Sequence, residues 1–270
     1  MTTDEDDGIS ARDFRGNEVR CDSCVHRDLL AQKRCQLQRA CVHDRYARRI
    51  DRFFDWNPAL ADDYLTHPHF EVRAIAAKSA SVFRLSSLLR DPDETVRWNA
   101  VRRLPARYLL GLRGDPHREV RIRVASLLNQ ADLVPMLRDP DYYVRVVVAR
   151  RLPAALLVLM IEDPEPEVRR IVASRIPEDW LSRIAMDRDG SVRLEAARRL
   201  SPERLGGLIN DADWRVRYHV ASRVEAAALA ALQDDPDPLV RDLARSRFDG
   251  MQKVQRGDVV AFGSGEGKES

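Results

Sequence analysis

The sequence predicts an all-α solenoid of short helical repeats, preceded by a small cysteine-rich module. Three observations predict this fold class. The dipeptide Val-Arg recurs every 24 residues, apolar residues follow each Val at helical spacing, and all four cysteines fall between positions 21 and 41. With 270 residues, 44% of them hydrophobic, the chain has ample material for a core, which excludes disorder as the whole structure.

The Val-Arg dipeptide marks eight units without an insertion. An Asp stands five residues before the Val in seven units, His67 takes its place in the first, and Pro follows in most. An Asp followed by Pro is typical of a helix N-cap and first turn, so each unit is expected to begin a helix there. The arginines of the dipeptide are Arg73, Arg97, Arg121, Arg145, Arg169, Arg193, Arg217 and Arg241.

Each unit is expected to hold one long helix and one very short one. Apolar residues recur four, five and eight places after the Val, as in Val168, Val172, Ala173 and Ile176, and this spacing is helical. A Pro such as Pro177 then ends the helix, and a shorter apolar pair follows. Two-helix repeats of the tetratricopeptide or HEAT kind need more than 24 residues. Ordinary leucine-rich repeats need a Leu-x-Leu strand pattern, which the sequence lacks.

The expected boundaries follow from these patterns. Residues 1–19 are expected to be a flexible N-terminus and residues 20–56 the cysteine module. Residues 57–66 resemble the second half of a degenerate repeat that caps the array. The eight repeats cover residues 67–250, and residues 251–270 are expected to be a C-terminal cap and flexible tail.

The N-terminus is acidic and lacks a secretory signal, and the longest apolar run, residues 154–161, is far shorter than the roughly 20 residues that span a bilayer. We therefore expect a soluble, cytoplasmic protein without a membrane partner. Thiols stay reduced in that compartment, so clustered cysteines indicate metal ligands rather than disulfides.

The predicted metal ligands are Cys21, Cys24, Cys35 and Cys41. A CxxC pair with two further thiols suits either structural zinc or the corners of an iron–sulfur cubane, and the spacing leaves both open. His26 and His43 could replace a ligand or donate a hydrogen bond from outside. Eight basic against three acidic residues between positions 20 and 50 would offset the charge of a cluster and raise its reduction potential, or simply keep a small module soluble.

The cysteine segment joined to 24-residue repeats with Asp-Pro before Val-Arg resembles the leucine-rich repeat variant proteins, over about residues 20–250. The resemblance implies alternating α- and 3₁₀-helices in two layers of a right-handed superhelix, and an N-terminal [4Fe-4S] cluster held by the four cysteines. It also implies a link to nitrogen-fixing bacteria, without an assigned biochemical activity. Arg188 and Ala212 depart from the pattern, because they replace the Pro and are expected to loosen the helix starts that follow.

Two columns of arginine run through the repeats. The Arg of each Val-Arg dipeptide falls within the apolar arc of its helix, where its head group needs a partner, so we expect a ladder of ion pairs with the recurring Asp between neighbouring repeats. The second column flanks the core, so its head groups could reach water and form a ridge that binds nucleic acid phosphates. It comprises Arg103, Arg151, Arg175, Arg199, Arg223 and Arg247.

The hypothesis from sequence is a non-enzymatic scaffold that binds another protein, with a structural or redox-sensing cluster. Electron transfer to a docked partner and nucleic acid binding by the arginine ridge are the alternatives. No phosphate loop, HExxH motif or nucleophile elbow is present in the sequence. Trp98 and Tyr218 are expected to face outward, and Trp214, Tyr142 and Tyr143 to lie in turns, where exposed aromatic residues favour a protein interface.

Overall fold

The computed structural model describes residues 10–255 of the chain. The chain divides into two compact units between Arg151 and Leu152, and each is described by itself. Within the described residues all regular structure is helical, apart from two isolated bridges, Arg12 with Glu18 and Gln36 with Ala40. None of these helices is both long and apolar enough to cross a membrane.

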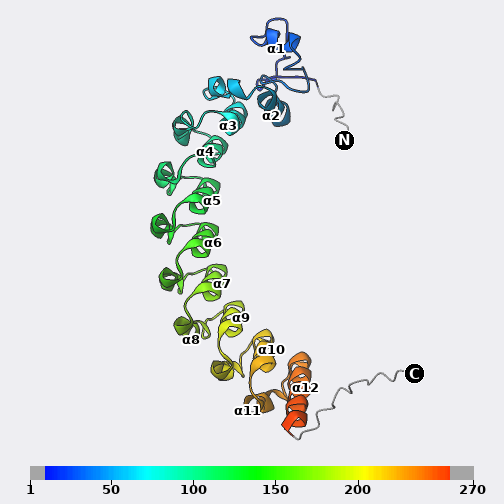
Figure 1. The fold of residues 1–270 in the computed structure, drawn as a ribbon, viewed down its shortest axis with the longest axis vertical. Coiled ribbons are helices and arrows are strands. Elements are labelled where there is room, and N and C mark those ends of the chain that lie inside the picture. Colours follow the sequence, from blue (N-terminus) through cyan, green and yellow to red (C-terminus); the bar gives the residue numbers. More distant parts are fainter. Residues whose placement is uncertain (1–9, 256–270) are drawn as a thin grey trace, which may run out of the picture. The chain divides into compact units, whose positions relative to one another are not determined.

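The first unit begins with the cysteine module and continues into the repeats. In Figure 1, α3 to α6 lie side by side in one row, and the short 3₁₀ segments form a second row beside them. The module and its neighbour contain α1 (Arg27–Ala31), α2 (Ala47–Trp56) and η1 (Pro58–Tyr64). The repeats of this unit contain α3 (Phe70–Ser79), η2 (Leu85–Arg90), α4 (Glu94–Val101), η3 (Ala106–Tyr108), η4 (Leu110–Leu112), α5 (Arg118–Leu127), η5 (Gln130–Met136) and α6 (Tyr142–Arg151).

The second unit repeats the same alternation. Its first half contains η6 (Ala154–Met160), α7 (Pro166–Arg175), η7 (Glu178–Trp180), α8 (Leu181–Ile184) and α9 (Gly190–Arg199). Its second half contains η8 (Pro202–Leu208), α10 (Trp214–Arg223), α11 (Ala226–Leu229), η9 (Ala230–Leu232) and α12 (Pro238–Gln255). The predicted pattern of one long helix and one very short helix for each Val-Arg unit is thus present in both halves of the chain.

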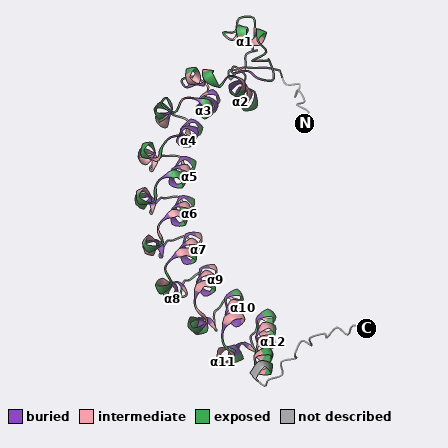
Figure 2. Cartoon of the chain, in the orientation of Figure 1, coloured by how far each residue is buried: buried purple, intermediate pink, exposed green. Residues whose placement is uncertain are grey.

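Each long helix buries the positions that the apolar pattern predicts. Val168, Val172, Ala173 and Ile176 are all fully buried, and the corresponding positions are buried in the repeats before the last, where the buried colour runs along the inner side of the long helices (Figure 2). In the last repeat Val240 and Ala244 are buried, whereas Arg245 is exposed and Phe248 is half-buried. In the second layer the buried pairs are three residues apart, as in Leu157 with Met160. A spacing of three places both side chains on one face of a 3₁₀-helix or of a single α-helical turn, and the second layer contains 3₁₀ segments in most repeats and the short α-helices α8 and α11 in two.

The helix starts differ from the prediction in one respect. Asp91, which was expected to be an N-cap, instead accepts the backbone N–H of Asp93 at 2.9 Å and closes a turn around Pro92. Helix α4 begins at Glu94, and its N-cap is Asp93, whose side chain accepts the N–H of Thr95. The predicted cap is therefore wrong by two residues, because Asx turns and N-caps share the same side-chain chemistry.

The structure also moves the boundaries expected at the N-terminal end. Residues 10–19 do not extend freely: the N–H of Val19 donates to the carbonyl of Ala11, and both side chains pack with Cys41 in a small core. Helix α2 buries Phe53 and Phe54 and packs against α3 and η1. The degenerate half-repeat at residues 57–66 therefore has a long helix of its own, and that helix is α2.

The last repeat has a different second half. Helix α12 starts at Pro238, where a repeat helix is expected, and runs on to Gln255 without a 3₁₀ segment. It packs against α10, α11 and η9 of the same unit. The flexible tail expected to follow it, and the flexible terminus expected at residues 1–9, lie outside the described residues.

Candidate metal centre

The four cysteines lie outside the helices: Cys21 and Cys24 precede α1, Cys35 follows it, and Cys41 precedes α2. All four are free thiols; Cys21, Cys24 and Cys35 are half-buried and Cys41 is buried. The N–H of Cys24 donates to the carbonyl of Cys21 at 3.4 Å, which folds the CxxC segment into a turn. The sulfur of Cys24 accepts the N–H of His26, and the Cys35 thiol lies 3.9 Å from the carbonyl oxygen of His26. The backbone of His26 therefore links two of the predicted ligands.

The thiols are close enough to perturb one another. Burial raises the pKa of Cys35, and its neighbours Cys24 and Cys21 raise it further. Burial raises the pKa of Cys41 to about 12, and Cys24 again contributes. Thiolates are thus disfavoured until a cationic centre binds them, so metal loading releases protons at this site.

The donor set consists of thiols alone, which suits zinc or an iron–sulfur cluster equally by chemistry. Within the described residues, no group of three or more His, Cys, Asp or Glu side chains is arranged to hold a single metal ion. A zinc ion would need its sulfurs about 2.3 Å from one centre. In an iron–sulfur cubane each thiolate binds a separate iron, so the four ligands surround a larger group.

The two histidines of the module are packed in an aromatic cluster rather than left free. A hydrogen bond joins Nε2 of His26 to the hydroxyl of Tyr64, at the end of η1. The ring of His43 stacks on that of His26, with 5.9 Å between the ring centroids. The ring of Phe53, on α2, lies 5.2 Å from the ring of His26. Burial lowers the pKa of both His26 and His43, and burial together with Cys24 raises the pKa of Tyr64 to about 12. The cluster of rings ties the cysteine loops to η1.

A buried ion pair fixes the loop that carries Cys41. Nη1 of Arg49 lies 2.9 Å from Oδ2 of Asp44, with side chains 7% and 0% exposed. Asp44 also accepts the N–H of Tyr46 just before α2, and the N–H of Cys41 donates to the carbonyl of Arg49. Basic residues of the module were predicted to offset cluster charge, but no motif or spacing indicates that Arg49 is the partner of a buried Asp.

The N-terminal segment also contributes to this region. Asp13 accepts two backbone N–H groups to close a turn at Gly16, whose φ of 89° requires glycine. The ring of Phe14 stacks on His69 at 5.1 Å, at the start of α3. His67 takes over the turn role of the usual Asp, because its Nδ1 accepts the N–H of His69.

The first arginine column forms an ion-pair ladder between neighbouring repeats within each unit. Nε and Nη2 of Arg97 each donate to Asp115, one repeat further on, at 2.8 Å, while Nη1 donates to the carbonyl of Asp91 in its own repeat. Each rung thus closes the turn of one repeat and holds the turn of the next. The hydrogen bond to Asp115 raises the pKa of Arg97. The other rungs with this geometry are Arg73–Asp91, Arg121–Asp139, Arg169–Asp187, Arg193–Asp211 and Arg217–Asp235.

The last arginine of the first column in each unit also donates to the turn of its own repeat. Arg145 donates to the carbonyl of Asp139 at 2.7 Å, and Arg241 to that of Asp235 at 2.6 Å. All eight arginines of the column therefore bond the turn of their own repeat.

Comparison with known proteins identifies both parts of the chain. Residues 11–63 match the family model described as the leucine-rich repeat variant protein FeS4 cluster. A solved structure described as a leucine-rich repeat variant with a novel repetitive protein structural motif is 41% identical, with a TM-score of 0.82 over 85% of this chain and 98% of that one. The chain belongs to the leucine-rich repeat variant family. The resemblance seen in the sequence and the all-helical repeat fold are confirmed.

The family match identifies the chain as an iron–sulfur repeat protein. A curated relative from Rhodobacter capsulatus, named an uncharacterized 27.7 kDa protein in the nifB 3' region, is 50% identical over 102 residues. That alignment covers 38% of this chain and spans only 42% of the relative.

The second arginine column does not form the free ridge that was predicted. Nη1 of Arg103 donates to the carbonyls of Ala77 and Ala80, at the C-terminal end of α3 in the preceding repeat. These carbonyls have no partner within their own helix, so the arginine caps the helix end. Corresponding bonds are made by Arg151, Arg175, Arg199, Arg223 and Arg247. The angular position was right, but the head groups turn to the preceding repeat rather than only to water.

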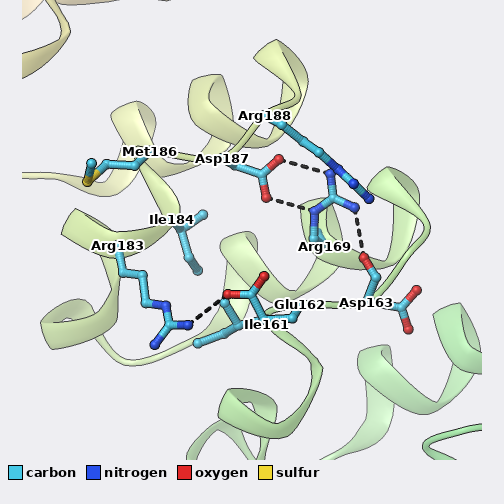
Figure 3. A pocket seen from close by; sticks show the side chains of 9 residues that line it. All are labelled: Ile161, Glu162, Asp163, Arg169, Arg183, Ile184, Met186, Asp187 and Arg188. Atoms are coloured by element: carbon cyan, nitrogen blue, oxygen red, sulfur yellow. Dashed lines mark hydrogen bonds and ion pairs between the residues drawn. The ribbon is translucent and has the colours of Figure 1, made fainter.

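A pocket of about 250 Å³ lies where Arg188 replaces the usual Pro (Figure 3). Asp187, in its wall, accepts both donors of Arg169, and Arg183 pairs with Glu162 at 2.7 Å on the exposed rim. Arg188 itself donates to a carbonyl of the preceding repeat at 3.0 Å. The loss of Pro therefore leaves this turn held by a hydrogen bond, and the charged groups around the pocket are engaged within the chain.

Proposed function

We propose that this repeat protein is a non-enzymatic scaffold that binds another protein through the exposed face of its long helices. Its [4Fe-4S] cluster, held by Cys21, Cys24, Cys35 and Cys41, stabilises the module or senses the redox state. The position of the curated relative near nifB supports a link to nitrogen fixation. When bound, the cluster supplies a one-electron couple.

The observation that carries this proposal is the exposure of large aromatic residues on the long helices of both units. Tyr142 and Tyr143 open α6 and are 44% and 39% exposed. Trp214 and Tyr218 lie one turn apart on α10 and are 41% and 40% exposed. Although the sequence placed three of these residues in turns, they belong to helices. Trp and Tyr on an exposed rigid helix are typical anchors of a protein interface.

The module's own contacts show how the cluster could affect the repeats. The Asp44–Arg49 pair holds the Cys41 loop on α2, and the bond from His26 to Tyr64 holds the CxxC loop on η1. Loss of the cluster would remove the attachment of the cysteine-bearing loops to one another but not these two contacts. We therefore expect local loosening of the module in a cluster-free protein, with the repeats still folded.

Partner capture tests the scaffold function. Anaerobically purified protein is cross-linked in cell extract, and captured proteins are identified and then titrated in purified form. The Trp214→Ala/Tyr218→Ala variant should lose the partner, whereas Phe83→Ala should keep it, because Phe83 is 94% exposed but lies outside the long helices. Equal capture by all three proteins would contradict the proposal. Iron and sulfide at about four each per chain support the cubane, whereas one zinc would exclude it.

Electron transfer is a second candidate, favoured by the exposure of the ligands. Cys21, Cys24 and Cys35 are only half-buried, so a cluster bound there would lie near the surface, within reach of a docked partner. Reversible one-electron reduction of the folded protein would support this role. Nucleic acid binding loses its main support, because the predicted ridge arginines bond to carbonyls. No salt-sensitive binding to DNA or RNA is therefore expected from that column.

A further inference from the structure

Two arginines from different repeats converge on one tryptophan of the first unit. Trp98 lies on α4, two residues after the Val of its repeat, and is half-buried. The guanidinium carbon of Arg102, one turn further on, lies over its ring at 5.2 Å from the centroid, and that of Arg123, on α5, lies at 4.7 Å. A guanidinium over an indole is a favourable cation–π contact, and here one ring receives two.

These guanidinium groups differ from those of the two arginine columns. Within the described residues, Arg102, Arg123 and Arg150 have no side-chain hydrogen bond or ion pair with a carboxylate or carbonyl. The acidic residues at the starts of α4 and α5 are engaged elsewhere: Glu94 lies 3.7 Å from His117, and Glu119 lies 3.1 Å from Arg118. Positive charge therefore accumulates around Trp98 without internal neutralisation.

Arg150 extends this charge along the repeats. Arg102, Ser126 and Arg150 each stand six residues after the Val of successive repeats, so they occupy the same position on neighbouring long helices. Helices in contact lie roughly 8–10 Å apart, so the backbones of Arg102 and Arg150 are separated by about 16–20 Å. We call Trp98, Arg102, Arg123 and Arg150 the Trp98 patch.

We propose that the Trp98 patch binds a carboxylate-rich surface of a partner protein. The proposal rests on the scaffold function and specifies where and by what chemistry a partner docks. The contact with the indole restrains each guanidinium, and its N–H groups, which have no carboxylate or carbonyl partner within the described residues, can take a carboxylate in the bidentate geometry that arginine favours. Because the groups are already ordered, binding costs less side-chain entropy than it would with free arginines.

The geometry favours carboxylates over a nucleic acid strand. Binding of single strands depends on aromatic rings that stack on bases. The ring of Trp98 is half-buried and already covered by guanidinium groups, so it is not available as a stacking platform. Binding to phosphate groups alone remains an outcome that the experiment must distinguish.

The test uses the full cluster-loaded chain and fluorescence anisotropy with three labelled probes. They are a helical 20-residue peptide with Glu on one face, the same peptide with Gln in place of Glu, and a 20-nucleotide single-stranded thymidine oligomer. The Glu peptide should bind, the Gln peptide should bind at least tenfold more weakly, and the oligomer should bind more weakly than the Glu peptide. Equal binding of the Glu and Gln peptides, or tighter binding of the oligomer, overturns the proposal.

Matched variants tie the binding to this patch. Arg102→Gln/Arg123→Gln should weaken binding of the Glu peptide by at least tenfold. Arg118→Gln/Arg215→Gln makes the same change in net charge at two exposed arginines that already pair with acids, so it should have under a twofold effect. Arg102→Lys/Arg123→Lys keeps the charge but loses the planar fork, and its affinity should fall between the two. Equal loss in the Arg118 control overturns the proposal.

The same variants applied to the captured partner separate this inference from the scaffold function. A partner that binds the parent protein and the Arg102→Gln/Arg123→Gln variant equally would refute the patch while leaving the scaffold intact. Specific binding of the Glu peptide with no captured partner would support the patch and count against the scaffold.

Discussion

The rung between Arg97 and Asp115 allows a direct test of what holds neighbouring repeats together. The change Arg97→Met keeps an apolar stem of similar length and removes the guanidinium. Among the described residues, the Asp115 side chain, 1% exposed, would then keep only the N–H of His117, at 2.9 Å, as a partner. Removing one member of a buried pair leaves an uncompensated charge, so we expect the free energy of unfolding to fall by about 3–5 kcal/mol.

A substitution of the acidic partner should lower the free energy of unfolding by less. In Asp115→Asn the turn bond to His117 can persist, and Arg97 keeps its bonds to the carbonyls of Asp91 and Pro92 at 2.8 and 3.1 Å. The bidentate bonds to a carboxylate are replaced by at most one bond from the guanidinium to an uncharged amide oxygen, which corresponds to a loss of about 2–3 kcal/mol. The loss of unfolding free energy in the double variant should be about 1–3 kcal/mol smaller than the sum of the losses in the two single variants, because the residues act as one unit.

Urea unfolding followed by circular dichroism gives the free energies, and hydrogen exchange at α4 and α5 shows whether the loss is local, as expected for repeat proteins. The control is Arg170→Met, because Arg170 pairs with Glu167 at 2.8 Å with both side chains about 40% exposed. That exposed pair should contribute under about 1 kcal/mol. A loss in Arg97→Met no larger than in the control, or strict additivity in the double variant, would refute a stabilising ladder.

Three further outcomes are expected. Asp44→Ala should expose the module to hydrogen exchange and lower its iron content, because Arg49 would lose its buried carboxylate and Tyr46 the acceptor of its backbone N–H, whereas Asp51→Ala, which breaks an exposed pair with Lys78, should do neither. Gly190→Ala should destabilise the protein, because its Cβ would collide with the carboxylate of Asp213, which caps α10. Gly250→Ala, with open space around it in α12, should raise the free energy of unfolding by about 0.5–1 kcal/mol. A change of the same sign in both variants would contradict this interpretation. Since the bond from Arg217 lowers the pKa of Asp235 below its ordinary value of 3.8, that carboxylate stabilises the fold fully above about pH 4 and progressively less as the pH falls through its folded pKa; the melting temperature of Asp235→Asn should therefore converge on that of the parent in acid, and a constant difference from pH 6 to pH 2.5 would disprove the linkage.

The sequence predicted the repeat fold well because its information is periodic. A spacing of four, five and eight residues after each Val defines one buried stripe, and the same stripe in every unit can only be covered by stacking the units. The position of Arg97 inside that stripe required a buried partner, and the Asp with the same period was the natural candidate. Even so, spacing within one helix could not show that Asp115, one repeat further on, is the residue that accepts.

The errors arose where the answer depends on the step between repeats. Arg103 lies at the edge of the apolar arc, an angle that suits both a solvated head group and a bond to the end of α3. Which of these occurs depends on where the preceding helix ends, and an angular argument within one helix does not contain that distance. The role of Asp44 in the module was missed for a similar reason, because its partner Arg49 is one of many arginines in a basic segment.

The internal use of arginine makes the remaining arginines informative. A guanidinium that satisfies a carboxylate in the next repeat, or carbonyls at the end of the preceding helix, is needed for stacking and has few donors left for a ligand. An exposed arginine elsewhere would ordinarily be unremarkable, since a chain with 45 basic and 43 acidic residues can pair most of its charges. Arg102 and Arg123 contact an indole ring instead of an acid, so within the described residues their N–H groups have no carboxylate or carbonyl partner and are available to a ligand. That combination costs the fold the repulsion of neighbouring positive charges, and an acidic partner would relieve it.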